Sequence, residues 1–233
     1  MKKLKELSLA LLFMGLVALL TIGCPTKNAF AAHSDSYIAL VIGNGNYRNI
    51  SPLSTPVKNA ADMANVLKKL GFEVTLAQNV NRRAMREAID EFETRLHHKG
   101  GTGLFYFSGY GLQNKGHNFL VPVDANIQHE ADIQFESLEV ERVLHRLKQA
   151  NDKIVILDCQ DIPFYYMSSK FFYTKRGLAQ INSHTSNTTI AIAAAPGQTT
   201  LTLTYHRNSV YTKQLVDVLS QKGTSMRTED VLK

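Results

Sequence analysis

Four stretches that combine reactive or flexible residues each follow a short apolar run. They are residues 43–46 (GNGN), 108–111 (SGYG), 158–161 (DCQD) and 195–198 (APGQ). Ligands of open parallel sheets bind at the carboxyl ends of the strands, so these stretches are expected to meet along one edge. The third of them contains Cys159, the single cysteine outside the N-terminal region. The pattern predicts a chemical site at this edge, with Cys159 as its most reactive group.

Cys159 has two interpretations. A thiol beside flexible glycine backbone suits a nucleophile for acyl transfer, because backbone N–H groups there form an oxyanion hole. Free cysteine is also among the most deeply buried residue types, and composition alone favours a packed core thiol. Residue type and position leave both open.

Other kinds of site fit the sequence less well. The GNGNY stretch lacks the third glycine of a dinucleotide fingerprint, and residues 51–55 separate it from the helix that would bind a phosphate. His97 and His98 are adjacent, and neighbours on a helix do not converge on one metal ion. Basic and aromatic residues do not alternate as in single-strand binders. We therefore expect no metal, no cofactor and no nucleic-acid partner.

The elements that position these stretches alternate along the chain. Apolar runs predict strands at 37–42, 72–76, 104–107, 154–157 and 189–194. Helical spacing of apolar residues predicts helices from about 57 to 67, after a cap at Asn81, from 140 to 147, and after a cap at Ser209. A hairpin is expected at 111–122 with its turn at 114–116, and a long surface loop at 164–186. This alternation predicts an α/β fold: a mostly parallel sheet with helices on both faces.

The N-terminal 31 residues have the pattern of a secretion signal. Lys2, Lys3 and Lys5 precede an apolar run at 7–22, and the AFA at 29–31 provides the small-x-small cleavage pattern. The alternative is a lipoprotein, in which Cys24 after Gly23 carries the lipid and tethers the chain to a membrane. We expect residues 1–31 to be a signal peptide and residues 32–233 an exported domain, periplasmic or extracellular.

Composition agrees with a single globular domain after the signal. The chain has 233 residues, is 44% hydrophobic and carries a formal charge of +6. The signal holds four lysines and one glutamate, so it contributes +3 and leaves +3 on the rest. A charge this small does not argue for a nucleic-acid partner.

Seven ordered motifs resemble the caspase-like cysteine peptidases, particularly their bacterial metacaspase-related (orthocaspase) branch. These are YIALVIGNGNY, PVKNAADMANVLKKLGFEV, LFYFSGYGLQNKGHNFLVPVDA, IVILDCQDIPF, RGLAQI, AAAPGQ and RNSVYT. The resemblance covers residues 36–233. It implies a caspase-hemoglobinase fold and a cysteine endopeptidase with a His-Cys dyad that cuts proteins after Arg or Lys. It also implies a large-subunit-like part at about 36–164, a loop at 165–187 and a truncated small-subunit-like part at 188–233.

The family's catalytic pattern carries over in part. Its nucleophile falls on Cys159 when the Pro-Phe that follows is aligned without a gap, and its oxyanion hole falls on the N–H groups of Gly111 and Cys159. Its general-base histidine lies in a Ser-Gly-His-Gly motif, where this chain has Tyr110. The family's Asp two residues before the cysteine, which helps receive a basic substrate side chain, falls on Leu157. Asp158 takes that place only if the strand shifts by one residue, and that shift also re-aims Cys159.

The missing histidine decides between two functions. An imidazole with a pKa of about 6.5 accepts the thiol proton near neutral pH, whereas a phenol with a pKa of about 10 does not. His117 is the nearest spare imidazole, but strand geometry carries it to the turn end of the hairpin, where we expect a surface residue. The favoured hypothesis is therefore a caspase-fold pseudopeptidase that binds a peptide or protein.

Two alternatives remain. One is an active cysteine endopeptidase that uses Cys159 and cleaves itself after Lys170, Lys175 or Arg176. The other is a decayed copy, because the chain stops soon after the SMRTEDVLK stretch, where relatives usually continue.

Overall fold

The computed structural model describes residues 36–163, 175–182, 186–200 and 207–222. The predicted signal at 1–31 with Cys24, the residue Lys170 and the C-terminal stretch 223–233 lie outside the described residues. No helix among the described residues is both long enough and apolar enough to cross a bilayer.

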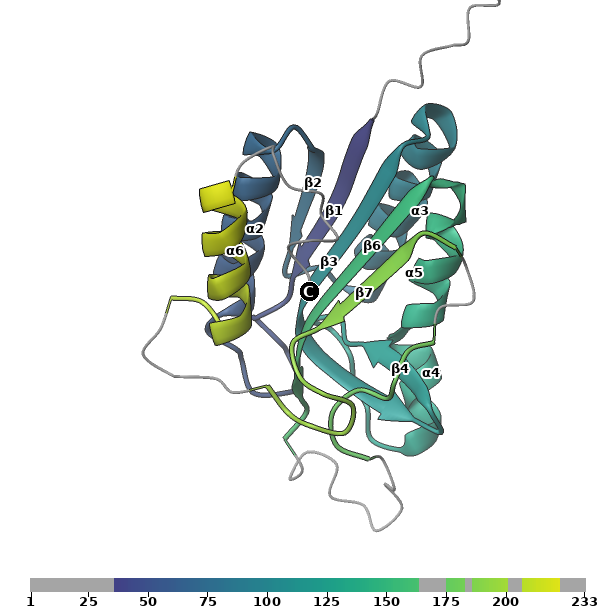
Figure 1. Cartoon of the computed structure of the whole chain (residues 1–233). Coiled ribbons are helices and arrows are strands. Elements are labelled where there is room, and N and C mark those ends of the chain that lie inside the picture. Colours follow the sequence, from purple (N-terminus) through teal and green to yellow (C-terminus); the bar gives the residue numbers. More distant parts are fainter. Residues whose placement is uncertain (1–35, 164–174, 183–185, 201–206, 223–233) are drawn as a thin grey trace, which may run out of the picture. The chain divides into compact units, whose positions relative to one another are not determined.

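The described part contains one seven-stranded sheet, shown in Figure 1. Its strands are β1 (Tyr37–Gly43), β2 (Glu73–Gln78), β3 (Thr102–Asn114), β4 (His117–Leu120), β5 (Leu138–Glu139), β6 (Asp152–Asp161) and β7 (Thr188–Ile192). The helices are α2 (Pro56–Lys69), α3 (Arg82–Lys99), α4 (Ile133–Glu136), α5 (Val140–Arg146) and α6 (Val210–Lys222), with 3-10 turns η1 (Glu130–Asp132) and η2 (Leu147–Gln149). Strand and helix alternate as the sequence predicts.

Parallel pairing dominates the sheet. Strands β2, β1, β3, β6 and β7 lie side by side in this order, each parallel to its neighbour. The antiparallel pairs are β3 with β4 and β4 with β5. The long strand β3 pairs with β1 along its first half and with β4 along its second half, while β6 runs along its other side. The prediction of a mostly parallel central sheet is confirmed.

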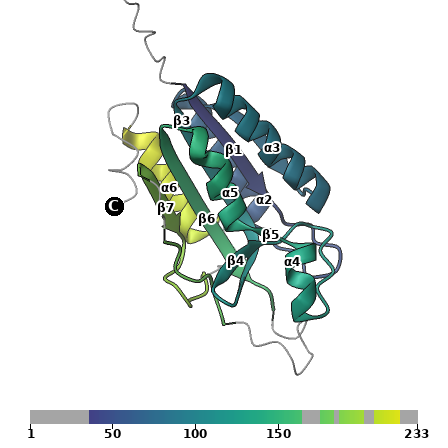
Figure 2. The same ribbon diagram turned by 90° about the vertical axis from the view of Figure 1, so that its right-hand side faces the viewer.

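Helices cover both faces of this sheet, as Figures 1 and 2 show. One face packs against α3 and α5, and its core includes Phe105, Phe107 and Leu157. The other face packs against α2 and α6, with Leu104 and Tyr106 in its core. Because alternate residues of a strand point to opposite faces, the continuous apolar runs of β1, β3 and β6 are those of strands buried on both sides. This α/β arrangement is the predicted one.

Local sequence signals set the helix boundaries. Asn81 has an extended backbone, and its side chain accepts a hydrogen bond of 2.8 Å from the Ala84 N–H, so the predicted cap of α3 is confirmed. Ser209 accepts a hydrogen bond of 3.1 Å from the Thr212 N–H at the start of α6, as predicted. Pro56 occupies the first turn of α2, where its missing N–H costs nothing.

Strands β3 and β6 extend further than the sequence predicts. Residues 108–111 and 158–161 were expected to follow strands, but they lie inside β3 and β6. Pairing with β4 explains the extension of β3, because that strand supplies a ladder partner where β1 ends. The predicted hairpin at 111–122 is therefore correct, and its first strand is the continuation of β3. Its turn lies at Lys115 and Gly116, as expected.

Candidate functional site

The four predicted stretches meet, in part, near the carboxyl edge of the parallel strands. Gly43, the last residue of β1, pairs with Ser108 of β3, which in turn pairs with Asp158 of β6. Beyond this level β3 and β6 continue together, without β1. The pairs there are Gly109 with Cys159, Tyr110 with Gln160 and Gly111 with Asp161.

This register separates the predicted nucleophile from the predicted base position. Residues that pair across two strands share a face of the sheet, and neighbours in sequence point to opposite faces. Tyr110 and Gln160 therefore share the face on which Asp158 lies. Cys159 points to the other face of the sheet, which it shares with its pairing partner Gly109 and with Gly111 two residues further on.

Cys159 is packed in the core on the face of α3 and α5. It is 9% exposed and belongs to the same apolar cluster as Phe107, Leu157 and Leu178. A methyl group on Gly111 would lie 2.9 Å from Sγ, so the thiol fills the space that a side chain at Gly111 would need. Burial raises the pKa of the Cys159 thiol well above its ordinary value, and the nearby carboxylates of Asp158 and Asp161 raise it further. The thiol is therefore protonated at neutral pH.

Asp158 is enclosed on the opposite face. It is 2% exposed, and its Oδ2 accepts hydrogen bonds from Asn59 Nδ2 at 3.1 Å, from Thr212 Oγ1 at 2.6 Å and from Ser209 Oγ. These donors come from α2 and from the start of α6. Burial raises the pKa of the Asp158 carboxyl, while the Ser209 and Thr212 hydroxyls lower it. In this structure the carboxylate ties α2 and α6 to the sheet and faces no open surface.

The surroundings of Tyr110 include a residue that the sequence analysis did not single out. Tyr110 is 2% exposed, and its ring lies 4.8 Å from that of Tyr47, centroid to centroid. The Tyr47 hydroxyl accepts a hydrogen bond of 2.7 Å from the Tyr110 N–H and donates one of 3.2 Å to the Val121 carbonyl. Burial raises the pKa of Tyr47 well above its ordinary value, so this phenol is neutral. It closes the gap between the end of β1 and the end of β4.

Residues 175–181, in the second half of the predicted loop, lie over the apolar face of the sheet, and we call them the covering segment. Gln113 Nε2 donates to the Arg176 carbonyl at 3.0 Å, and the Gly177 N–H donates to Asp161 Oδ1 at 2.8 Å. Asn118 bonds both the N–H and the carbonyl of Ala179, at 2.7 and 3.0 Å. The peptide bond after Arg176, a predicted self-cleavage point, is thus hydrogen-bonded through both of its polar atoms.

The remaining predicted site residues are not brought to the thiol as free groups. Gly111, the predicted oxyanion donor, lies within β3 and pairs with Leu120 on one side and Asp161 on the other. His117 lies at the turn end of the hairpin, as predicted, and its Nδ1 is 2.8 Å from Glu139 Oε1.

Comparison with known families agrees with this fold. The family model described as the caspase domain matches residues 36–233, which is most of the chain. The chain belongs to the caspase family. The solved structure of the Drosophila initiator caspase Dronc superposes on this caspase domain with a TM-score of 0.56 and 10% identity, covering 84% of this chain and 69% of Dronc. At that identity the likeness shows the fold.

Two mammalian proteins share a segment of this caspase domain. Human mucosa-associated lymphoid tissue lymphoma translocation protein 1 is 42% identical over 88 residues, 38% of this chain. Its mouse homologue is 39% identical over 88 residues. The matched segments are 11% and 10% of the length of these relatives. The similarity is therefore to a small part of much longer proteins.

The sequence analysis missed three features of this caspase domain. Tyr47 gave no signal because its role depends on the gap left between β1 and β4. Gln160 gave none because only the register shows that it lies opposite Tyr110. Leu178, which packs against Cys159 from the covering segment, lies in a stretch without periodicity. The RGLAQI motif quoted above marks that segment without indicating where it packs.

Proposed function

We propose that this caspase domain is a catalytically impaired pseudopeptidase that binds a peptide or protein without cleaving it. The observation that supports the proposal most directly is the strand register at the candidate site. Tyr110 and Gln160 lie opposite each other on one face, and Cys159 is buried on the other. The charged groups that act on this thiol among the described residues are the carboxylates of Asp158 and Asp161, not an imidazole, and the thiol is 9% exposed.

The spacing of the family's catalytic residues also places the nucleophile at a position other than Cys159. The family's nucleophile follows the pocket Asp by two residues, and residues two apart on a strand share a face. Asp158, Gln160 and Tyr110 share a face in this chain, so Gln160 stands where that spacing places the nucleophile. On this assignment both members of the dyad are replaced, the histidine by Tyr110 and the cysteine by Gln160. Cys159 is then a core residue next to the nucleophile position.

The chemistry of the replacements supports loss of turnover. The Gln160 amide is not a nucleophile, and a neutral phenol does not accept a thiol proton near pH 7. The carboxylate that would attract a substrate Arg or Lys is already enclosed by hydroxyl and amide donors. Loss of catalytic residues leaves at most about 10³- to 10⁴-fold acceleration over water in a well-studied triad. We expect less here, because the predicted oxyanion donor Gly111 lies within β3 and is paired with a strand on each side.

A peptidase assay on the full chain tests the proposal. Wild-type protein, Cys159→Ala and the double variant Tyr110→His with Gln160→Cys are each given fluorogenic peptides with Arg or Lys before the leaving group. We expect no turnover above buffer from wild type, and no change on Cys159→Ala. If turnover appears, we expect it only in the double variant, and Tyr110→His alone stays inactive because Cys159 points away.

Two outcomes contradict the proposal. Wild-type turnover that Cys159→Ala abolishes identifies the chain as an active endopeptidase for Arg or Lys bonds. Activity gained by Tyr110→His alone, and lost again on Cys159→Ala, places the nucleophile at Cys159 and refutes the assignment to Gln160.

We also propose that the domain belongs to the bacterial metacaspase-related branch and is exported after removal of residues 1–31. The basic start, the apolar run and the AFA motif support export. Mass spectrometry of the mature N-terminus distinguishes the routes. A chain that begins at Ala32 supports secretion, a lipid-modified Cys24 identifies a membrane-tethered lipoprotein, and an intact Met1 contradicts both.

A further inference from the structure

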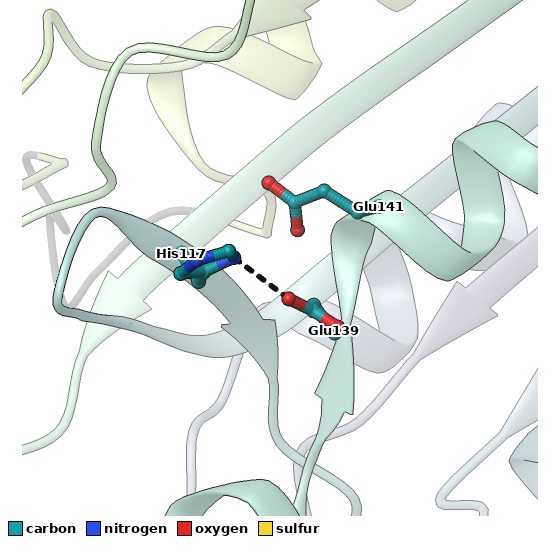
Figure 3. Close-up of side chains that lie close together, drawn as sticks. All are labelled: His117, Glu139 and Glu141. Atoms are coloured by element: carbon teal, nitrogen blue, oxygen red, sulfur yellow. Dashed lines mark ion pairs between the residues drawn. The ribbon is translucent and has the colours of Figure 1, made fainter.

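Three side chains that can bind a metal converge on the surface away from the strand edge described above. They are His117, at the start of β4, Glu139, the last residue of β5, and Glu141, in the first turn of α5. Their ligand atoms all lie within 4.8 Å of one another. Figure 3 shows the imidazole against Glu139, with the Glu141 carboxylate turned toward this pair. His117 lies 22 residues before Glu139, so no compact sequence motif marks the cluster.

The sheet itself brings these groups together. Strands β4 and β5 are antiparallel, with Phe119 opposite Glu139. Strand alternation puts His117 on the face that Phe119 and Glu139 share. The chain then enters α5, whose first turn carries Glu141 beside this pair. The backbone of two paired strands and the helix that follows them therefore fixes the positions of the three residues.

The cluster has an excess of negative charge. Glu141 forms no ion pair with any described residue, yet its carboxylate lies close to that of Glu139. Burial raises the pKa of the Glu141 carboxyl, and the neighbouring Glu139 carboxylate raises it further. The two carboxylates repel each other, His117 offsets part of that repulsion, and a divalent ion bound by all three groups removes it.

The neighbouring surface leaves access to the cluster. His117 and Glu139 line a hollow of about 910 Å³, bordered also by Arg82, Lys115, Phe135 and Arg142. Lys115 is paired with Glu130 at 3.0 Å, and Arg82 donates to the Phe135 carbonyl, so these two cations have partners of their own. An ion in the cluster can therefore keep water ligands on the side of the hollow.

From this convergence we propose that His117, Glu139 and Glu141 bind a divalent first-row transition metal ion, of which Zn²⁺ is the representative. One imidazole nitrogen and two carboxylate oxygens are a ligand set that zinc accepts at about 2.0–2.2 Å, with water in the open position. Tetrahedral ligands at that length lie about 3.4 Å apart, so the site is completed when the His117–Glu139 pair, 2.8 Å apart, opens slightly and the Glu141 side chain closes toward it. Calcium prefers six to eight oxygen ligands and is expected to bind more weakly.

Isothermal titration calorimetry on the full chain with any affinity tag removed tests the site, with Zn²⁺ and Ca²⁺ as separate titrants. We expect one zinc ion per chain, and at least about tenfold weaker binding for His117→Ala and for Glu141→Gln, equivalent to about 1.4 kcal/mol. His97→Ala and Glu87→Gln on α3 are the matched controls, and both should bind zinc as wild type does. Zinc should also raise the melting temperature of wild type more than that of Glu141→Gln, because binding links β4 to α5.

Four results overturn the proposal, and three of them concern the titrations of wild type and of the ligand variants. They are the absence of a 1:1 zinc event in wild type, a zinc affinity unchanged in both His117→Ala and Glu141→Gln, and tighter binding of calcium than of zinc. Loss of zinc binding in His97→Ala in place of His117→Ala assigns the metal to the helix α3 histidines and also refutes it. Circular dichroism of each variant confirms that the fold is retained, so a loss of binding is not a loss of structure.

Discussion

The two faces of the β3–β6 strand pair differ in kind although they are one residue apart in sequence. On the face of α2 and α6, Asp158 is surrounded by hydroxyl and amide donors from α2 and from the start of α6. On the face of α3 and α5, Cys159 lies against apolar side chains and glycine backbone. The polar face carries the buried hydrogen bonds that position α6, and the apolar face seals the thiol. A side chain that is shifted by one residue along this strand therefore lies on the apolar face and not on the polar one.

The comparison shows that a residue of the expected type on a strand does not by itself make a catalytic site. A side chain's chemistry depends on its face, and a one-residue slip exchanges the two faces completely. The pKa of Cys159 is raised by the same burial that makes the residue a good core thiol. Substitutions on one face or the other should therefore lower the free energy of unfolding by different amounts.

The largest effect is expected on the polar face. Asp158→Ala removes the shared acceptor of Asn59, Ser209 and Thr212 and leaves buried donors unpaired, so unfolding free energy should fall by about 3 kcal/mol. Urea unfolding followed by circular dichroism measures the loss. Asp152→Ala, at the exposed start of the same strand, is the control and should change stability by less than about 0.5 kcal/mol. Equal effects at both positions would mean that the Asp158 network is not structural.

A smaller effect is expected on the apolar face. Cys159→Ser places a hydroxyl among apolar side chains and should cost about 1–3 kcal/mol, more than Cys159→Ala, which loses only packing. The same urea titration ranks the two variants. Gln160→Ala, one residue on and only half-buried, should be near neutral. If Ser is tolerated better than Ala at position 159, the thiol faces water or a polar partner and the comparison of the two faces is wrong.

The smallest of these effects concerns the covering segment. Asn118 is fully buried and bonds Ala179 twice, so Asn118→Ala should loosen residues 175–181 and cost about 1–2 kcal/mol. Trypsin should then cut after Arg176 several-fold faster, as measured by mass spectrometry of timed digests. Asn114→Ala at the tip of β3 is the control. An unchanged rate in Asn118→Ala would show that other contacts hold the segment.

Much of this fold follows from sequence pattern. The apolar runs of β1 and β6 predict buried parallel strands, and the Asn81 and Ser209 caps predict where α3 and α6 begin. These signals are local, since each depends on residues within one or two turns of one another. The family assignment also rests on motifs in order along the chain. Local signals of this kind located these strands and helices, although β3 and β6 extend beyond the predicted ends.

The arrangement of residues at the candidate site could not be predicted from local sequence pattern. Whether Cys159 or Gln160 lies opposite Tyr110 depends on the pairing of two strands far apart in sequence, and a single residue decides it. The extension of β3 beyond Phe107 depends on β4 replacing β1 as its partner. The convergence of His117 with Glu139 and Glu141 depends likewise on β4–β5 pairing. Each of these features is set by tertiary contacts that no local pattern encodes.

The reactivity of the Cys159 thiol tests the central claim most directly. In a Cys24→Ser background, the rate of alkylation by iodoacetamide is measured for native and urea-unfolded chain at about pH 8, close to the ordinary thiol pKa of about 8.5. Because burial raises the pKa of Cys159, we predict that the native chain reacts at least about a hundredfold more slowly, with a rate that still rises above about pH 9. Native alkylation as fast as that of the unfolded chain, levelling off below about pH 7, would reveal an activated thiolate and contradict the account.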